Sequence, residues 1–307
     1  MMDIAVIGSN MVDLVSYIER MPKEGETLEA PDFEIGCGGK GANQAVAAAK
    51  MGSDVMMVTK VGDDLFADNT IANFKKHGID TEYVVKVPGT SSGVAPIFVD
   101  KESKNSILII KGANKQLAPE DVDAAAEKIK KCSVIVLQLE VPLETVYRAI
   151  DFGNEWNIPV ILNPAPASKE LDFQYVCKSD YFIPNESELE ILTDMPVTTE
   201  SEIAAAASSL VQKGLKNVIV TMGSRGAMWV TNEAVHVVPS YPVKAIDTTG
   251  AGDAFIGCFS HGLVKHGDVL EAMRKASAFA ALSVTKRGSQ ASYPNEDELQ
   301  PFLLSNV

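Results

Sequence analysis

Short apolar runs alternate along this chain with longer segments whose pattern predicts helices. The runs are typical of strands buried on both faces and cover residues 4–8, 55–59, 133–138, 159–162, 181–183 and 217–221. The predicted helices cover residues 45–51, 65–77, 119–130, 143–156, 186–192, 200–213 and 269–285. Strands that alternate with helices in this way predict a mostly parallel, doubly wound sheet. We therefore expect a three-layer α/β fold with helices on both faces of the sheet.

A second group of segments alternates apolar and polar residues more regularly and predicts a separate sheet. These segments cover residues 15–18, 27–35, 93–99 and 106–110. Alternation of this kind is typical of a sheet with one face in solvent. Because the segments come from two distant parts of the chain, we expect a small β-sheet lid, formed by about residues 14–36 and 93–111 and inserted in the main domain. Residues 1–307 would then form one domain.

The composition disfavours several classes of protein. Of the 307 residues, 46% are hydrophobic, which is enough for a substantial core. The formal net charge of −14 disfavours nucleic acids and anionic membranes as partners. No apolar run approaches the ~18 residues of a membrane span, and the N-terminus lacks the basic region of a signal peptide. The four cysteines are Cys37, Cys132, Cys177 and Cys258, and no two of them form a CxxC pair. This spacing argues against a zinc site and a disulfide framework and fits a reducing cytoplasm.

The stretch Asp247-Thr248-Thr249-Gly250-Ala251-Gly252-Asp253 joins an extended run at 241–246 to an apolar helical segment. A glycine loop at the start of a helix points unpaired backbone amides outward, and such amides bind anions. Gly250 and Gly252 leave room for a phosphate to approach the backbone, and Asp253 follows directly. The alternative is that Asp253 is only an N-cap. A cap requires neither the two glycines nor the second acid, so the pattern favours phosphoryl transfer.

The glycine-rich stretch 36–44 opens another predicted helix. It is not a P-loop, because Gly41 stands where the Ser or Thr that holds magnesium would be. Its glycines, Lys40 and Asn43 suit a neutral polyol, since they offer close backbone approach and a few directed hydrogen bonds. The alternative is a flexible loop before a helix.

Polar residues follow several of the predicted strands. Ligands of parallel sheets bind at the carboxyl ends of the strands, so these residues should converge on one edge: Asp13, Glu140, Asn163, Asn185, Gly223 and Asp247. Two alternatives stay open. Asn185 and Glu188 have the spacing of a capping box, or they place an acid near the magnesium of a nucleotide. The loop 221–226 either cradles a phosphate tail or is a plain turn. The four histidines fall outside these groups.

Four motifs in this order resemble those of the ribokinase (PfkB-type) sugar kinases, over about residues 4–294: Gly38-Gly39-Lys40-Gly41-Ala42-Asn43, Asn163-Pro164-Ala165-Pro166, Pro184-Asn185-Glu186-Ser187-Glu188 and the stretch 247–253. The likeness is greatest to the kinases of pentoses. It implies a ribokinase-like fold and transfer of the γ-phosphoryl group of ATP to the 5-hydroxyl of a pentose. It also implies Mg²⁺ and K⁺ as cofactors and a homodimer formed through the lid.

The resemblance assigns roles to individual residues. Asp253 would be the general base, and the backbone of Gly250, Ala251, Gly252 and Asp253 would stabilise the charge on the phosphoryl group. The sugar would contact Met11, Asp13, Gly39, Lys40, Gly41, Asn43, Glu140 and Asp253. ATP would contact Asn185, Thr221, Met222, Gly223, Ser224, Arg225, Gly226, Gly252 and Ser277. Glu188 would hold magnesium through water. Potassium would bind, partly through main-chain carbonyls, at Asp247, Thr249, Ser283, Lys286, Gly288 and Ser292.

Met11 departs from the pattern of many ribokinases, which have an asparagine there. A methionine cannot hydrogen-bond a hydroxyl as an amide can. Loss of that polar partner should reduce activity on ribose more than activity on a sugar without the hydroxyl. We therefore expect good activity on 2-deoxyribose, with ribose also accepted. The alternatives are a kinase of another sugar or of a nucleoside, and an inactive sugar sensor on the same fold.

Overall fold

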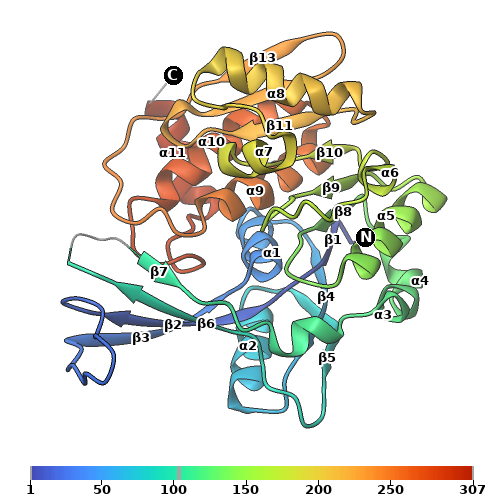
Figure 1. Cartoon of the computed structure of the whole chain (residues 1–307). Helices are drawn as coiled ribbons and strands as arrows, with labels where there is room; N and C mark the ends of the chain where they lie inside the picture. Colours follow the sequence, from blue (N-terminus) through green and yellow to red (C-terminus); the bar gives the residue numbers. More distant parts are fainter. Residues whose placement is uncertain (1, 102–104, 306–307) are drawn as a thin grey trace.

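The computed structural model describes residues 2–101 and 105–305 and has two sheets (Figure 1). The large sheet has nine strands in the order β13-β12-β11-β10-β9-β8-β1-β4-β5. All neighbours pair in parallel except β11–β12 and β12–β13, which are antiparallel. The strands are β1 (Ile4–Ile7), β4 (Val55–Val61), β5 (Asp80–Lys86), β8 (Val134–Leu137), β9 (Val160–Leu162), β10 (Tyr181–Phe182), β11 (Val218–Thr221), β12 (Ala227–Val230) and β13 (Val235–Val238).

The central strands are apolar because both of their faces are buried. In β1, Ile4 and Val6 pack into one core, and Ala5 and Ile7 pack into the other. The first core is closed by helices α1 (Lys40–Lys50), α2 (Leu65–Lys76), α9 (Ala251–His266), α10 (Val269–Ser283) and α11 (Glu296–Ser305). The second is closed by α3 (Pro119–Ala124), α4 (Ala126–Ile129), α5 (Leu143–Trp156), α6 (Phe173–Val176), α7 (Glu186–Thr193) and α8 (Glu200–Gln212). Two 3₁₀ turns complete the described elements, η1 (Gly112–Gln116) and η2 (Gly223–Arg225).

The small sheet extends away from the large one (Figure 1). Its strand order is β3-β2-β6-β7, with β2 (Met11–Tyr17), β3 (Asp32–Gly38), β6 (Val94–Val99) and β7 (Asn105–Ile107). β2 follows β1 after a short turn, and β3 leads directly into α1. The two sheets therefore meet where the glycine-rich stretch begins α1.

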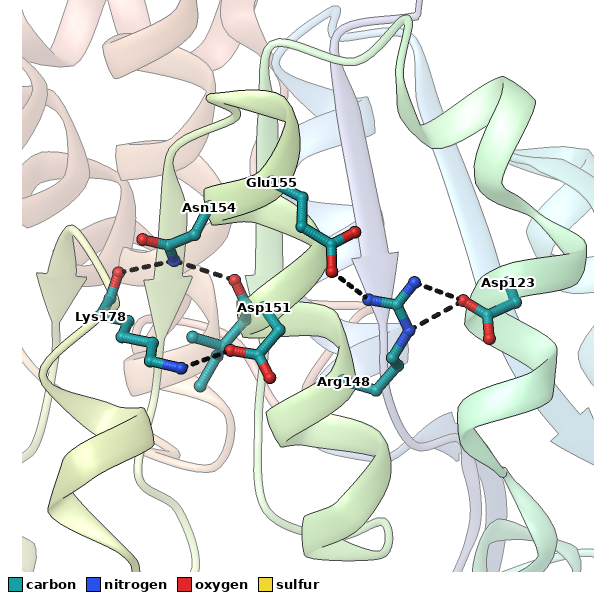
Figure 2. Close-up of polar contacts among 7 residues, drawn as sticks. Asp123, Arg148, Asp151, Asn154, Glu155 and Lys178 are labelled. Atoms are coloured by element: carbon teal, nitrogen blue, oxygen red, sulfur yellow. Dashed lines mark hydrogen bonds and ion pairs between the residues drawn. The ribbon is translucent and has the colours of Figure 1, made fainter.

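Ion pairs join helices of the outer layer far from that junction. Figure 2 shows Arg148 of α5 between Asp123 of α3 and Glu155, and Lys178 next to Asp151. The Arg148 Nε donates to Asp123 Oδ1 at 2.8 Å, and the Lys178 Nζ donates to Asp151 Oδ1 at 2.6 Å. Pairs that are this exposed contribute about 0–1 kcal/mol each, so they support the layer and take no part in the site.

The three-layer α/β fold predicted from the pattern is confirmed, and most predicted elements lie within a few residues of their observed bounds. Some expectations were wrong. The predicted helix 119–130 is divided at Ala125, and the predicted strand 27–35 begins only at Asp32. The run 241–246 pairs with neither sheet; the Ile246 N–H donates to the Val284 carbonyl at 2.7 Å, which holds the run against the end of α10.

Several elements had no counterpart among the predictions, among them β5, α11 and β13. β5 is an edge strand with several charged residues, and α11 contains Pro301, which weakens a helical pattern. β13 completes an antiparallel hairpin with β12. Within the described part of the chain, no helix has the length and apolar character needed to cross a membrane.

Candidate active site

The first turn of α9 forms the centre of the site. Gly250 caps the helix with φ +75°, and its carbonyl accepts a hydrogen bond from the Tyr293 hydroxyl at 2.9 Å. A Cβ at Gly250 would lie 2.7 Å from that hydroxyl, whereas a Cβ at Gly252 would meet nothing within 4 Å. The protein itself therefore requires glycine at 250, and the space in front of Gly252 is free for a ligand.

One predicted amide is used within the protein. The Ala251 N–H donates to the Thr248 carbonyl at 3.2 Å, so it is a weaker candidate for binding a phosphate than we expected. The amides of Gly252 and Asp253 belong to the first helical turn, where the helix supplies no acceptor. These two amides are the donors that the helix start offers to an anion.

Asp253 is buried, with 7% of its surface exposed. Each carboxylate oxygen accepts one side-chain amide from α1. Asn43 Nδ2 donates to Oδ2 at 3.0 Å, and Gln44 Nε2 donates to Oδ1 at 3.0 Å. These two hydrogen bonds fix the orientation of the carboxylate, and a carboxylate is a side chain that can act as a general base.

Glu140 holds the start of α1 against the end of β8. Its Oε2 accepts the Ser9 hydroxyl at 2.5 Å and the Lys40 backbone N–H at 2.9 Å. Gly39, the N-cap of this helix, has φ +89°, and a Cβ there would lie 2.6 Å from the Met11 nitrogen. The predicted sugar residues of the glycine-rich stretch are thus packed against the β1–β2 turn.

Several carboxylates lie close enough to Asp13 and Lys40 to shift the pKa values of these two residues. Burial, then repulsion from Glu140 and Asp253, raises the pKa of Asp13 from 3.8 to about 7, although a hydrogen bond with Ser289 opposes the shift. Burial lowers the pKa of Lys40, but Asp253, Glu140 and Glu188 together raise it above its usual value. Lys40 is therefore a cation held among carboxylates.

Two cavities adjoin this cluster, and Ala245 and Thr248 line both. The first cavity, of about 660 Å³, is lined by the predicted ATP residues Asn185, Thr221, Gly223, Ser224, Gly226, Gly252 and Ser277. The buried Ser277 hydroxyl has no hydrogen-bond partner within the described residues, as expected of a group that a ligand completes. The second cavity, of about 490 Å³, lies between the small sheet, which carries Asp13 on β2, and the loops that carry Asp247, Thr249, Gly288 and Ser289.

Two predicted ATP residues do not face the first cavity. The Met222 side chain is 2% exposed and belongs to the hydrophobic core. Arg225 forms an ion pair with Glu186 and donates to the Thr198 carbonyl at 2.9 Å. Their neighbours in the 221–226 loop line the cavity, whereas these two side chains point elsewhere.

The capping box at α7 is confirmed. Asn185 Oδ1 accepts the Glu188 N–H at 2.8 Å, and Glu188 Oε2 accepts the Asn185 N–H at 2.8 Å. Burial raises the pKa of Glu188 above its usual value. No group of three or more metal-binding side chains occurs in residues 2–101 and 105–305.

Around Asp247 the predicted potassium residues form a loop rich in oxygen atoms. The Asp247 oxygens accept the Thr249 and Gly288 N–H groups, each at 2.9 Å. Burial would raise the Asp247 pKa, but these hydrogen bonds and the charge of Arg287 lower it. The Ser283 and Ser292 hydroxyls donate to carbonyls within the chain at 2.8 Å, and the Lys286 Nζ pairs with Glu298 at 2.9 Å. Main-chain carbonyls and an ionised Asp247 are what remain for a cation there.

Sequence reasoning missed Ser9 and Gln44. Both are fully buried, and both contact predicted site residues directly, Glu140 and Asp253. The signal was present, because Gln44 follows Asn43 in the glycine-rich motif and Ser9 follows the first strand. Nothing in the sequence indicates which acid each would contact.

A large parallel sheet, a helix start open to a phosphate and a nearby cluster of buried acids together define a phosphotransferase for small molecules. Comparison with known proteins agrees, because the sequence model of the pfkB family of carbohydrate kinases matches residues 1–296. The chain therefore belongs to the pfkB family and is a carbohydrate kinase.

Individual relatives are similar over their full length. The deoxyribokinase of Salmonella typhi is 66% identical over 305 residues, which cover 99% of this chain and 100% of that protein. The ribokinase of Bacillus subtilis is 39% identical over 303 residues, with 99% and 100% covered. The solved structure of Arabidopsis thaliana ribokinase with ribose and ATP superposes with a TM-score of 0.92 at 31% identity and covers 99% of each chain.

Proposed function

We propose that the protein transfers the γ-phosphoryl group of ATP to the 5-hydroxyl of a pentose, 2-deoxy-D-ribose or D-ribose. One observation carries the proposal: Asp253 adjoins residues that line both cavities. It follows Gly252, which lines the first cavity, and it is close enough to Asp13, which lines the second, to raise that residue's pKa. ATP in the first cavity and a sugar reaching Asp253 from the other side would bring donor and acceptor together.

The chemistry follows from this placement. Asp253 accepts the proton of the 5-hydroxyl as that oxygen attacks the γ-phosphorus, and ADP leaves with the bridging oxygen. The amides of Gly252 and Asp253 stabilise the negative charge on the phosphoryl oxygens. Positioning supplies most of the remaining rate enhancement. Asp13, Lys40, Asn43 and Glu140 would bind the other sugar hydroxyls; for Asp13, Lys40 and Glu140, that role would explain why their charges are gathered in one place.

Met11 supports 2-deoxyribose as a substrate. Its side chain is 2% exposed, and its sulfur lies 3.8 Å from the Asn114 Nδ2. A Cβ at Gly93 would lie 2.8 Å from the same sulfur, so the thioether fills a fixed place. A thioether is at best a weak acceptor, and a sugar hydroxyl facing it would lose a partner. The similarity to a deoxyribokinase points the same way.

Two cations fit the residues present. Mg²⁺ would be held through water near Glu188 and would neutralise charge on the ATP phosphates. K⁺ would be held by the Asp247 loop, chiefly by carbonyl oxygens of Thr249, Ser283, Lys286, Gly288 and Ser292. The hydrogen bonds that keep Asp247 ionised support a nearby cation.

The small sheet would act as a lid over the second cavity, within a single domain of residues 1–307. It would also form a homodimer, because it exposes large apolar side chains: Phe33 is 52% exposed, Ile35 is 55% and Ile107 is 46%. Pairing would cover this apolar surface and the edges of the sheet. The four cysteines are free thiols, which supports a cytoplasmic location.

The test is ADP release measured side by side with ribose and 2-deoxyribose, with and without K⁺. The proposal expects sugar-dependent ADP release that is lost in Asp253→Asn while the sugar still binds. A sugar sensor would release no ADP even as wild type. If hexoses or nucleosides were turned over and pentoses were not, the pentose assignment would be wrong. A ribose kcat/KM far above that of 2-deoxyribose would overturn the argument from Met11.

A further inference from the structure

A chain of side-chain amides leads from α2 to the carboxylate of Asp253. Asn73 Nδ2 donates to Gln290 Oε1 at 2.8 Å. Gln290 Nε2 donates to Asn43 Oδ1 at 3.0 Å, and Asn43 Nδ2 donates to Asp253 Oδ2 at 3.0 Å. Each amide thus accepts from the residue before it and donates to the next, and the chain ends on the proposed base.

A second, shorter chain reaches the other oxygen of Asp253. Gln138 Nε2 donates to Gln44 Oε1 at 2.6 Å, and Gln44 Nε2 donates to Asp253 Oδ1 at 3.0 Å. Gln44 also donates to Asn163 Oδ1 at 3.3 Å. Both carboxylate oxygens are therefore fixed by amides that are themselves oriented by other amides.

The direction of both chains is set by Asp253. An ionised carboxylate only accepts hydrogen bonds, so Asn43 must turn its NH₂ group toward it. The Asn43 oxygen then needs a donor, and Gln290 supplies one. Turning any amide around would place two acceptors or two donors face to face. Because Gln290 and Asn43 are 5% and 6% exposed, water could not easily relieve such a mismatch.

The backbone of Gln290 is also held in place by a hydrogen bond from Lys50. It lies in the loop after α10, where the Lys50 Nζ donates to the Gln290 carbonyl at 3.1 Å and to the Tyr293 carbonyl at 2.5 Å. The same loop donates the Gly288 N–H to Asp247. Nothing in the two cavities requires an amide at position 290, since this side chain lines neither of them. Its hydrogen bond to Asn43 is what needs explaining.

We infer that Gln290 is a positioning residue for phosphoryl transfer: through Asn43 it fixes the carboxylate of Asp253 in the orientation that receives the 5-hydroxyl proton. The inference rests on the proposed role of Asp253. A base displaced by a fraction of an ångström loses much of its rate enhancement, while ATP binding, at the far side of Gly252, is left intact. The loss should therefore fall on kcat and not on the KM for ATP.

Two substitutions of similar shape separate orientation from packing. Gln290→Met keeps the volume and removes the donor. Gln290→Glu keeps the shape but places an acceptor opposite Asn43 Oδ1. Gln116→Glu is the matched control, because Gln116 is exposed and bonds only to Thr90.

The expected result is a fall in kcat of about tenfold or more in both Gln290 variants, with the KM for ATP within about twofold of wild type. The Gln116→Glu control should match wild type.

The inference is overturned if both Gln290 variants keep kcat within about twofold of wild type, or if the fall in kcat is accompanied by an equal rise in the KM for ATP. Should they fail to fold, Asn73→Asp replaces them, since it removes the donor to Gln290 Oε1 from a partly exposed position; unchanged kcat at every pH would then refute the idea. These outcomes differ from failure of the proposed function, in which wild type or Asp253→Asn would behave contrary to a kinase using that base.

Discussion

Replacing Asp13 by asparagine tests the electrostatics of the site with little change in its shape. The Asp13 carboxylate fits so closely against β3 that a Cβ at Gly38 would lie 2.3 Å from its Oδ2. Asparagine has nearly the same shape, so the variant keeps this fit and removes a charge next to Glu140 and Asp253. We expect Asp13→Asn to stabilise the free protein at neutral pH and to weaken sugar binding.

The size and sign of the effect follow from the pKa of Asp13, which is raised from 3.8 to about 7. Below pH 3.8 the contribution of the protonated group to stability is fully present. As the pH rises toward 7 the unfolded chain releases this proton while the native protein keeps it, so the contribution is lost across that window. A shift of about three units corresponds to ~4 kcal/mol. Because Asp13 borders a cavity, screening by solvent reduces this to about 1–2 kcal/mol.

The assay is urea unfolding of wild type and Asp13→Asn at several pH values between about 4 and about 8, with Asp68→Asn as an exposed control. The free energies of unfolding should coincide near pH 4, and the variant should become more stable by about 1–2 kcal/mol near pH 8. The KM for the sugar should rise in the same variant. Equal pH dependence of wild type and Asp13→Asn would refute the argument, because it would mean that Asp13 is not destabilised by its neighbours.

Four further substitutions separate the parts of the site from each other and from the outer layer. Gly250→Ala should lower stability by about 1–3 kcal/mol, because φ is +75° and Tyr293 Oη is 2.7 Å away, whereas Gly252→Ala should leave the Tm unchanged and abolish ADP release by blocking the phosphate. Met11→Asn should raise kcat/KM for ribose relative to 2-deoxyribose by about tenfold; an unchanged ratio would contradict the role of Met11. Arg148→Met should change stability by less than ~1 kcal/mol and leave kinetics as in wild type, and a kinetic effect would show that the outer layer is coupled to the site.

How well the sequence predicted each element depended on how local its cause was. Short apolar runs marked the buried central strands, because a strand covered on both faces tolerates few polar residues. β5 lies at the edge of the large sheet, where charged residues are tolerated, so its sequence lacks the apolar run that predicts a buried strand. The capping box of Asn185 and Glu188 was predictable because its whole mechanism lies within four consecutive residues.

Side-chain direction was less predictable, because it depends on partners distant in the chain. Most of the loop 221–226 lines a cavity, but the sequence could not say that Met222 turns into the core or that Arg225 pairs with Glu186. Ser9 contacts Glu140 across 131 residues of sequence. No local pattern contains contacts of this kind.

The first turn of α9 shows where the division falls. The sequence alone determined that Gly250, Gly252 and Asp253 begin a helix open to an anion, because backbone geometry and helix polarity are local properties. Only the tertiary structure decided what surrounds Asp253. Asn43 and Gln44 come from α1 and are separated from Asp253 by 210 and 209 positions in the sequence. Asn73 likewise lies 217 positions from Gln290. Hydrogen bonds require atoms to meet in space, so the orientation of the proposed base is a property of the folded chain.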